Sequence, residues 1–426
     1  MSLPSLIPTN HVLTSGTNSA LTWTNVLTLS SVSTNKIAFN STVIALGSLA
    51  GSTIQNNYAV AIGPNAGQSS QSTSAVAIGN TAGNSNQFAN AVAIGANAGA
   101  TSQSTNCVAI GSAAGNSSQG QEAVAVGVAA GNSAQGTSAT ALGNRAGNSS
   151  QGASATAVGF QAGFTSQGTN AVAIGNSAGN SNQFANAVAI GVNAGYSLQS
   201  SHTVAIGTYS GQTSQGEGAV AVGVSAGGGS QGVNAIAIGN SAGNATQGER
   251  AVAVGNQAGQ LSQGNYAIAI GHAAGNSNQH TQSIVINATG GTKESAGVNT
   301  CVIAPIRNAA GTHVLNYTAT SGEVTYTTSS RSTKNSIEDL LTDTSKVYQL
   351  VPKTFLYNTD PQSGRHVGYI AEDVHDVDPA FATHETPDSP PVAINFNAVQ
   401  IYMLEEMKKL RAEVDALKAQ LAPPSA

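Results

Sequence analysis

The segment "AVAIGPNAGQSSQSTS", residues 59–74, recurs along the chain with a period of sixteen residues. Fifteen copies begin at residue 43 and at every sixteenth residue thereafter, the last at residue 267. Glycine occupies the fifth and ninth positions of every copy, and glutamine occupies the thirteenth, from Gln55 to Gln279. A repeat this short and regular predicts a mostly β solenoid in which each copy forms one coil.

The opening of each copy has the pattern of a short strand. Val60 and Ile62 fall on one face of such a strand, and the smaller Ala59 and Ala61 fall on the other. The repeated glycines suit tight corners, and the polar remainder predicts an outer, wetter edge. Coils stacked at a strand spacing of about 4.8 Å would make a rod of roughly 70 Å, with the glutamines in a ladder.

Both faces of the predicted strand are apolar, one with Val and Ile and the other with Ala. A single solenoid buries only one face inside its coil, so the other face is expected to pack against partner chains. The repeat therefore predicts an oligomer, and the sequence leaves open which face lines the partner contact. On these residues, segment 43–286 resembles the left-handed parallel β-roll of trimeric YadA-type adhesin heads.

Charge is distributed unevenly. Residues 1–328 hold five acidic side chains, all Glu, and five basic ones, whereas the last 98 residues hold fourteen acidic and nine basic ones. With no basic face for phosphates, nucleic acid is not an expected partner. The first segment also has no Asp and no two Glu close in sequence, which argues against a glycan-degrading spike.

No cofactor or metal is expected. Cys107 and Cys301 are the two cysteines, and Cys107 stands where most copies have Ala, which predicts a small buried residue. The histidines form no cluster with metal-ligand spacing. The amino terminus has neither the basic region nor the apolar run of a secretory signal, and no segment is long enough to span a bilayer, so membrane insertion is not expected.

Four segments follow from these patterns. Residues 1–42, with the single Trp23, form an N-terminal cap or attachment segment. Residues 43–286 form the repeat shaft, and residues 287–328 form a β-rich stem, which the strand-like runs of that region predict. Residues 329–426 form a small charged α+β domain.

The last segment carries motifs spread along its length. "SSRSTKNSI" opens it, and "VPKTFLYN" and "HVGYIAEDVHDVDP" follow. These stretches resemble the intramolecular chaperone domain of endosialidase-type phage tail spikes at matching positions, which are Ser329, Arg331, Lys334, Pro352, Phe355, Gly368, Ala371, Glu372 and Pro379. The sequence departs from that family at Ser330, where Asp is usual, and at Ser336, where Asn is common.

The resemblance implies self-cleavage. In that family a Ser–Lys dyad cuts the chain before the serine, which here is the Thr328–Ser329 bond. Ser329 is then the nucleophile and Lys334 the base, because a buried, neutral lysine can accept the hydroxyl proton. The activity implied is a single-turnover serine peptidase with no external substrate.

The C-terminal helix carries apolar residues at a 3-4 spacing suited to a coiled-coil seam, namely Met403, Met407, Leu410, Val414, Leu417 and Leu421. Glu405 and Lys409 have the spacing of an i,i+4 ion pair on its flank. A single packed helix shows a similar period, so the seam by itself leaves the number of chains open.

A strict repeat has a register problem, because slipping one chain by a whole coil preserves nearly every contact. A C-terminal domain that trimerises first would align the coils and then be removed. The sequence thus predicts a homotrimeric viral fibre, assembled in host cytoplasm and carried on the virion surface, that contacts a host receptor or glycan. The alternatives are a bacterial surface adhesin and a fibre whose chaperone domain is not cleaved.

Overall fold

The computed structural model describes residues 42–308, 315–318, 321–358, 361–362, 364–386 and 388–421. The predictions made for residues 1–41, including Trp23, lie outside the described residues. The described chain divides into two compact units, the first ending at Ile306 and the second beginning at Arg307.

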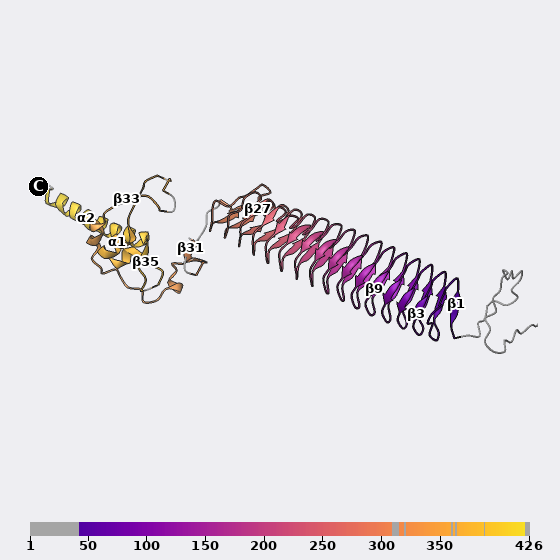
Figure 1. The fold of residues 1–426 in the computed structure, drawn as a ribbon. Helices are drawn as coiled ribbons and strands as arrows, with labels where there is room; N and C mark the ends of the chain where they lie inside the picture. Colours follow the sequence, from indigo (N-terminus) through magenta and orange to yellow (C-terminus); the bar gives the residue numbers. More distant parts are fainter. Residues whose placement is uncertain are drawn as a thin grey trace, which may run out of the picture. The chain divides into compact units, whose positions relative to one another are not determined.

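The first unit is a parallel β-solenoid, as the sixteen-residue period predicts (Figure 1). Its coils form two sheets, one of seventeen strands and one of thirteen. Every strand pairs in parallel with its counterpart in the next coil, so Val76 pairs with Val92 and Gln87 pairs with Gln103. Equivalent residues therefore stack directly above one another along the rod.

The strands of the larger sheet are β1 (Ile44–Leu46), β2 (Val60–Ile62), β4 (Val76–Ile78), β6 (Val92–Ile94), β8 (Val108–Ile110), β10 (Val124–Val126), β12 (Thr140–Leu142), β14 (Thr156–Val158), β16 (Val172–Ile174), β18 (Val188–Ile190), β20 (Val204–Ile206), β22 (Val220–Val222), β24 (Ile236–Ile238), β26 (Val252–Val254), β28 (Ile268–Ile270), β29 (Ile284–Asn287) and β30 (Cys301–Ala304). The strands of the smaller sheet are β3 (Ser69–Gln71), β5 (Ser85–Gln87), β7 (Thr101–Gln103), β9 (Ser117–Gln119), β11 (Ser133–Gln135), β13 (Ser149–Gln151), β15 (Thr165–Gln167), β17 (Ser181–Gln183), β19 (Ser197–Gln199), β21 (Thr213–Gln215), β23 (Ser230–Gln231), β25 (Thr246–Gln247) and β27 (Ser262–Gln263).

The interior of the solenoid is made of alanine and glutamine. In a typical coil Ala75, Ala77 and Ala82 are fully buried, together with Gln87. The structure thus decides which strand face lines the coil: it is the alanine face. The expectation that the polar part of the repeat, glutamine included, forms an outer edge was wrong for the glutamines, which point inward because their amides complete the backbone hydrogen bonding there.

Most of the glutamines join three groups through one amide nitrogen, as Gln71 shows. Nε2 of Gln71 donates to the carbonyl oxygens of Val60 and Ala75, at 2.8 and 3.1 Å, and to Oε1 of Gln87 at 3.1 Å. The predicted glutamine ladder is therefore present, and it links the two sheets within a coil as well as successive coils. Buried amides satisfied in this way avoid the cost of an unpaired polar group.

The two repeated glycines are explained by close contacts. Gly79 has φ +131°, and a Cβ there would lie 2.7 Å from the backbone of Gly95 in the next coil. Gly83 has φ +50°, and a Cβ would lie 2.6 Å from Oε1 of Gln87. Both a left-handed backbone and a lack of space exclude a side chain at these positions.

The Val and Ile side chains of the larger sheet face outward. Val172 is partly buried and Ile174 is 38% exposed, whereas Ala173 between them is fully buried. The same alternation runs through the sheet, so its outer surface is a continuous apolar strip, here called the Val/Ile face. One apolar strand face therefore remains open to solvent in the single chain.

The parallel sheet continues past residue 286. Ile284 of β29 pairs with Cys301 of β30, so Cys301 joins the Val/Ile face. The intervening segment folds against the last regular coil, where the Lys293 carbonyl accepts a hydrogen bond from the Gly275 N–H at 2.7 Å. This segment covers part of the coil edge, which is otherwise open to pairing.

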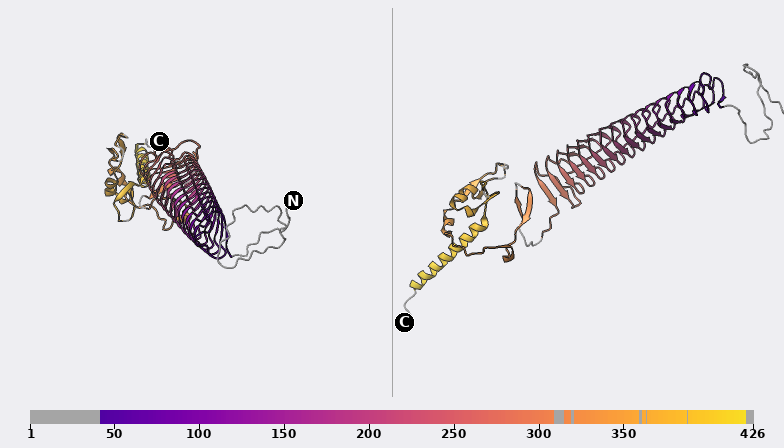
Figure 2. Two further views of the ribbon diagram at one scale, coloured as in Figure 1. Left: turned by 45° about the vertical axis from the view of Figure 1, so that its right-hand side comes forward. Right: turned by 90° about the horizontal axis from the view of Figure 1, so that it is seen from below.

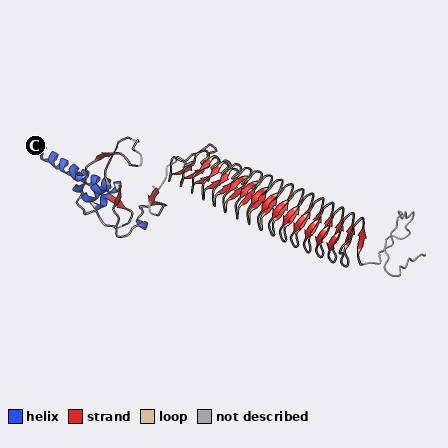
Figure 3. Cartoon of the chain, viewed as in Figure 1, coloured by secondary structure: helices blue, strands red, loops and turns tan. Residues whose placement is uncertain are grey.

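The second unit contains all the described helices (Figure 3). It begins with an antiparallel hairpin of β31 (Leu315–Thr318) and β32 (Glu323–Tyr326). The elements that follow are η1 (Arg331–Thr333), η2 (Thr344–Gln349), β33 (Lys353–Phe355), β34 (His366–Gly368), α1 (Ala371–Val377), η3 (Pro379–Phe381), β35 (Ala382–His384), β36 (Pro391–Ile394) and α2 (Phe396–Leu421).

A small core holds this unit together. Val374 of α1 and Phe381 of η3 pack with Val399 and Tyr402 from the start of α2, and all four are buried. The rings of Phe381 and Tyr402 meet edge to face, with centroids 4.8 Å apart. Only the first turns of α2 belong to this core, and the rest of the helix extends beyond it (Figure 2).

Candidate functional site

The segment that follows β32 forms a single tight turn. Ser330 is the N-cap of η1, and its side-chain oxygen accepts a hydrogen bond from the Ser332 N–H. The N–H of Thr333 donates to the Ser330 carbonyl at 2.9 Å, and Thr328 Oγ1 donates to Thr333 Oγ1 at 3.0 Å. This turn reverses the chain between Thr328 and Thr333.

The turn brings together the two residues predicted as a catalytic dyad. Nζ of Lys334 lies 2.9 Å from Oγ of Ser329 and donates a hydrogen bond to it. The same distance suits proton transfer in the opposite direction once the lysine is neutral, because general-base catalysis needs base and nucleophile within hydrogen-bond reach. The predicted cleavage bond, Thr328–Ser329, lies directly beside this contact.

One expectation about the dyad is not met in the single chain. The sequence argument required a buried lysine, but Lys334 and Ser329 are both exposed, as are the residues around them. The reason is that the described elements of the second unit bury no residue of η1. Water therefore has access to the dyad in the isolated chain.

The two departures from the family pattern have different structural consequences. Ser330 caps η1 through its side-chain oxygen, a role that Asp also performs, so the exchange preserves the turn. Ser336 has φ +48°, in the left-handed region where Asn is better tolerated than Ser. The turn thus has a normal cap, and the strained residue lies two positions after Lys334.

A polar cluster that the sequence analysis did not single out anchors α2. Glu406 accepts hydrogen bonds from Thr344 of η2 and, at 2.7 Å, from Lys409, which also donates to Thr344 at 2.8 Å. The hydrogen bond from Lys409, followed by that from Thr344, holds the pKa of Glu406 below its ordinary value. The sequence did contain a signal for this cluster. Glu406 has helical spacing with the apolar residues Val399 and Tyr402, which places its side chain on the same face of the helix.

The same cluster corrects the predicted ion pair. Lys409 pairs with Glu406 rather than with Glu405, and Glu405 instead binds Lys408 at 2.6 Å. Glu406 offers Lys409 a carboxylate already fixed by Thr344, which accounts for the preference.

Asp378 forms a second anchor between the helices. It caps η3 through the Ala380 N–H and binds Lys346 of η2 at 3.1 Å. Partial burial works to raise the pKa of Asp378, but the Ala380 N–H and the Lys346 ammonium more than offset it, so this pKa lies below its ordinary value. The two anchors hold η2 against α1, η3 and α2.

Two apolar surfaces of the second unit are open to solvent. On one face of the hairpin, Leu315, Tyr317, Val324 and Tyr326 are 61 to 70% exposed. On α2 the predicted seam residues are 38 to 83% exposed, and these are Met403, Met407, Leu410, Val414, Leu417 and Leu421. A groove beside Met403 and Met407 is completed by Val347, Tyr348 and Tyr369. Surfaces this apolar are typical of interaction sites.

The comparison with known families finds a match to part of the second unit. Residues 329–383 match the family model described as the chaperone of endosialidase. The match begins at the serine that Lys334 contacts. No curated protein and no solved structure matches the chain. The likeness of the repeats to adhesin heads therefore rests on the repeat residues alone.

Among the described residues, no three His, Cys, Asp or Glu side chains are grouped so that they would hold a metal ion. None of the helices in the described part of the chain is long and apolar enough to cross a membrane.

Proposed function

We propose that the protein is a homotrimeric viral fibre of the tail-spike type, and that its C-terminal domain sets the trimer and its register. The observation that carries this proposal is the Val/Ile face. It runs along seventeen parallel strands and remains half-exposed in the single chain, although it holds the largest aliphatic side chains of the repeat.

The narrow interior strengthens the argument. A coil filled with alanine methyl groups and one glutamine buries little apolar surface, and burial is the main source of folding free energy. Covering the Val/Ile face with two further copies would add the larger aliphatic groups to a buried core. The trimer is then part of what stabilises the solenoid.

The second unit supplies the means of alignment. The exposed hairpin face and the exposed α2 seam both lie outside the repeat, so neither can slip by one coil. We infer that three copies join through these surfaces first and that the solenoids then pair from that end. The match to a chaperone family supports this order of assembly.

Cleavage would follow assembly. Lys334, once neutral, accepts the hydroxyl proton of Ser329, and Oγ bonds to the carbonyl carbon of Thr328. The Thr328–Ser329 C–N bond breaks, and the amide nitrogen takes the proton from Nζ. Water then hydrolyses the resulting ester, which leaves a carboxylate on Thr328 and restores the Ser329 hydroxyl. Partner chains would cover the exposed dyad and so restrict cleavage to the trimer.

The remaining parts of the proposal concern the setting. The fibre would be assembled in the host cytoplasm, be carried on the virion surface and attach to a host receptor or glycan. The near absence of charge in the solenoid supports a role as a passive shaft or attachment surface, because nothing in it resembles a site for chemistry on an external substrate.

The oligomeric state tests the proposal. A Ser329→Ala chain, which keeps its full length, is expected to have three times the chain mass by light scattering. Cys301 is exposed on the Val/Ile face of the single chain, whereas Cys107 is buried, which raises the pKa of its thiol. In the proposed trimer Cys301 is covered, so a maleimide should leave it unmodified in the native protein and label it after the trimer is dissociated, and Cys301→Ser should abolish this labelling. A monomeric, folded chain would overturn the proposal.

A further inference from the structure

A longer period is superimposed on the sixteen-residue repeat. The hexapeptide Gly-Asn-Ser-Asn-Gln followed by a ring residue occurs three times, at residues 83–88, 179–184 and 275–280, ending in Phe88, Phe184 and His280. Successive occurrences are 96 residues apart, which is six coils. In the coils between them the position of the ring is occupied first by Ser and then by four glycines in succession.

The two phenylalanines stand out from the solenoid surface. Phe88 is 51% exposed and Phe184 is 54% exposed, although neither belongs to the Val/Ile face. Each follows a strand of the smaller sheet, β5 or β17, on the other side of the coil. Partner chains that cover the larger sheet would therefore leave these rings open.

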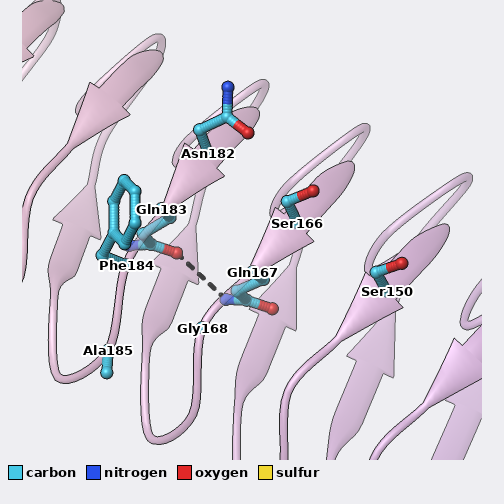
Figure 4. Close-up of a pocket in the computed structure, with 8 residues that line it drawn as sticks. All are labelled: Ser150, Ser166, Gln167, Gly168, Asn182, Gln183, Phe184 and Ala185. Carbon is cyan, nitrogen blue, oxygen red and sulfur yellow. Dashed lines mark hydrogen bonds between the residues drawn. The ribbon is translucent and has the colours of Figure 1, made fainter.

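A hollow accompanies each ring. The one beside Phe184 has a volume of about 430 Å³ and is bounded by Ser150, Ser166, Asn182 and the backbone at Gly168 (Figure 4). A smaller hollow beside Phe88 is bounded by Ser70, Ser72 and Asn86. The repeat thus builds the same arrangement twice, an aromatic ring beside hydroxyl and amide groups.

The four successive glycines at the ring position leave the surface next to Phe184 without side chains. A Cβ on Gly168 would lie 2.5 Å from the backbone of Phe184, so no side chain fits there. Equivalent close contacts exist at Gly120, Gly136 and Gly152. From Ser104 to Phe184 the surface at this position carries backbone and small hydroxyl groups only, which gives a ligand access along the axis of the rod.

The chemistry of these hollows points to one class of ligand. No charged side chain bounds either of them, so phosphate-bearing and other anionic ligands lack a counter-charge. Sugar rings present C–H faces that stack on aromatic rings and hydroxyls that exchange hydrogen bonds with Ser and Asn. Sites of this kind combine an apolar platform with a few orienting polar groups.

We propose that Phe88 and Phe184 are stacking platforms for a neutral, linear glycan that lies along the solenoid. The coil step of about 4.8 Å is comparable with the advance of one sugar residue in an extended chain, and six coils separate the rings by about 29 Å. One glycan chain can therefore engage both rings, which raises its apparent affinity. This inference rests on the attachment role proposed above and gives that role a ligand class and a place.

The third occurrence of the motif is built differently. The His280 ring lies 2.8 Å from Oγ of Ser295, and the His280 N–H donates to the same oxygen at 2.9 Å. The imidazole is thus tied to the segment that covers the end of the solenoid. The glycan contact is assigned to the two phenylalanines only.

The test uses the full-length Ser329→Ala chain on an array of neutral and acidic glycans, with affinities measured for each bound glycan. Phe88→Ser and Phe184→Ser are suitable variants, because Ser104 and Ser200 occupy the same position in neighbouring coils. Phe160→Ser is the matched control, since Phe160 is similarly exposed, at 48%, but follows a strand of the larger sheet.

Binding to at least one neutral linear glycan is expected. Each Phe→Ser change should weaken it by about tenfold or more, and Phe160→Ser should leave it unchanged. Absence of neutral glycan binding, preference for acidic glycans, or binding unaffected by the double variant would each overturn the inference. Light scattering on the same samples separates the two proposals: loss of the trimer in the Phe variants would instead show that the rings are subunit contacts.

Discussion

Gln103 and Gln119 are consecutive members of the glutamine ladder, yet they do not bind one another. Within the described chain Oε1 of Gln119 is buried and accepts no hydrogen bond. The interruption coincides with Cys107, which replaces the usual Ala next to Gln103 and places Sγ 2.7 Å from the Gly120 carbonyl oxygen. The larger sulfur, held close to that carbonyl, accounts for the missing link.

Cys107→Ala should repair the ladder. The variant is expected to be more stable than the parent by about 1 kcal/mol, because a buried unpaired acceptor costs about 1–3 kcal/mol and the lost sulfur contacts offset part of the gain. Thermal unfolding of the purified protein measures the change. The reciprocal variant Ala91→Cys should break the link between Gln87 and Gln103 and lower the melting temperature; equal melting temperatures for all three chains would contradict this account.

Ser329→Ala and Lys334→Met should each prevent cleavage. The parent chain is expected to yield a fragment ending at Thr328, since the dyad is already within 2.9 Å, and both variants should keep the full-length mass. Intact-mass spectrometry of the purified products gives the answer. Lys408→Met, which removes an exposed lysine paired only with Glu405, is the control and should still be cut. A Thr328 fragment from the Lys334→Met chain would remove Lys334 from its assigned role.

Gly83→Ala should destabilise the solenoid strongly. Its φ of +50° alone costs an alanine about 1–3 kcal/mol, and the new methyl group would also displace Oε1 of Gln87. Gly291→Ala is the control, because no atom lies within 4 Å of a Cβ at that position. The melting temperatures of the two variants measure the two losses of stability. Similar losses would show that the close contact at Gly83 is not the reason for glycine at this position of the repeat.

Ile174→Asp should prevent assembly of the trimer. The change puts a charge in the middle of the Val/Ile face, and an unpaired charge buried between subunits costs several kcal/mol. Ser214→Asp places the same charge on the smaller sheet, where it stays in water, and should leave the trimer intact. Light scattering distinguishes the outcomes; trimers formed by both variants would place the subunit contact elsewhere.

Acid should loosen the attachment of α2. The pKa of Glu406 is lowered in the folded chain, so its contribution to stability is present above the ordinary glutamate pKa and is lost as the pH falls through the lower, folded value. The loss is therefore expected below about pH 4. Thermal unfolding followed by the helical far-ultraviolet signal measures it. Glu406→Gln should be less stable near neutral pH and should lose less on acidification; an equal acid response would assign the effect to other carboxylates.

The sequence predicted the solenoid because every copy has glycine and glutamine at the same positions. The fold of one sixteen-residue segment is ambiguous by itself. Fifteen copies with the same glycines and glutamine favour parallel stacking, which aligns equivalent residues in successive coils. The pattern did not predict which face of the strand points into the coil. Alanine and valine are both apolar, and the decision depends on the width of the coil, which the alanines and one glutamine already fill.

The sequence predicted the two residues of the dyad, but it did not predict that they would be exposed. The five-residue spacing from Ser329 to Lys334 suits a tight turn, and the Ser330 cap completes it. Lys334 is exposed rather than buried, because burial depends on elements packed over η1 and the described part of the chain buries no residue of η1. The Glu406 cluster was missed for a related reason, since Thr344 lies 62 residues away in sequence and only the folded domain brings it near.

The length of the solenoid is set by the number of its coils. Each coil touches only the coils before and after it, so gaining or losing one sixteen-residue copy changes the reach of the rod by a single strand spacing and leaves both ends untouched. If the fibre proposed above is correct, its length can therefore change by whole coils while every remaining coil keeps the same kind of neighbour.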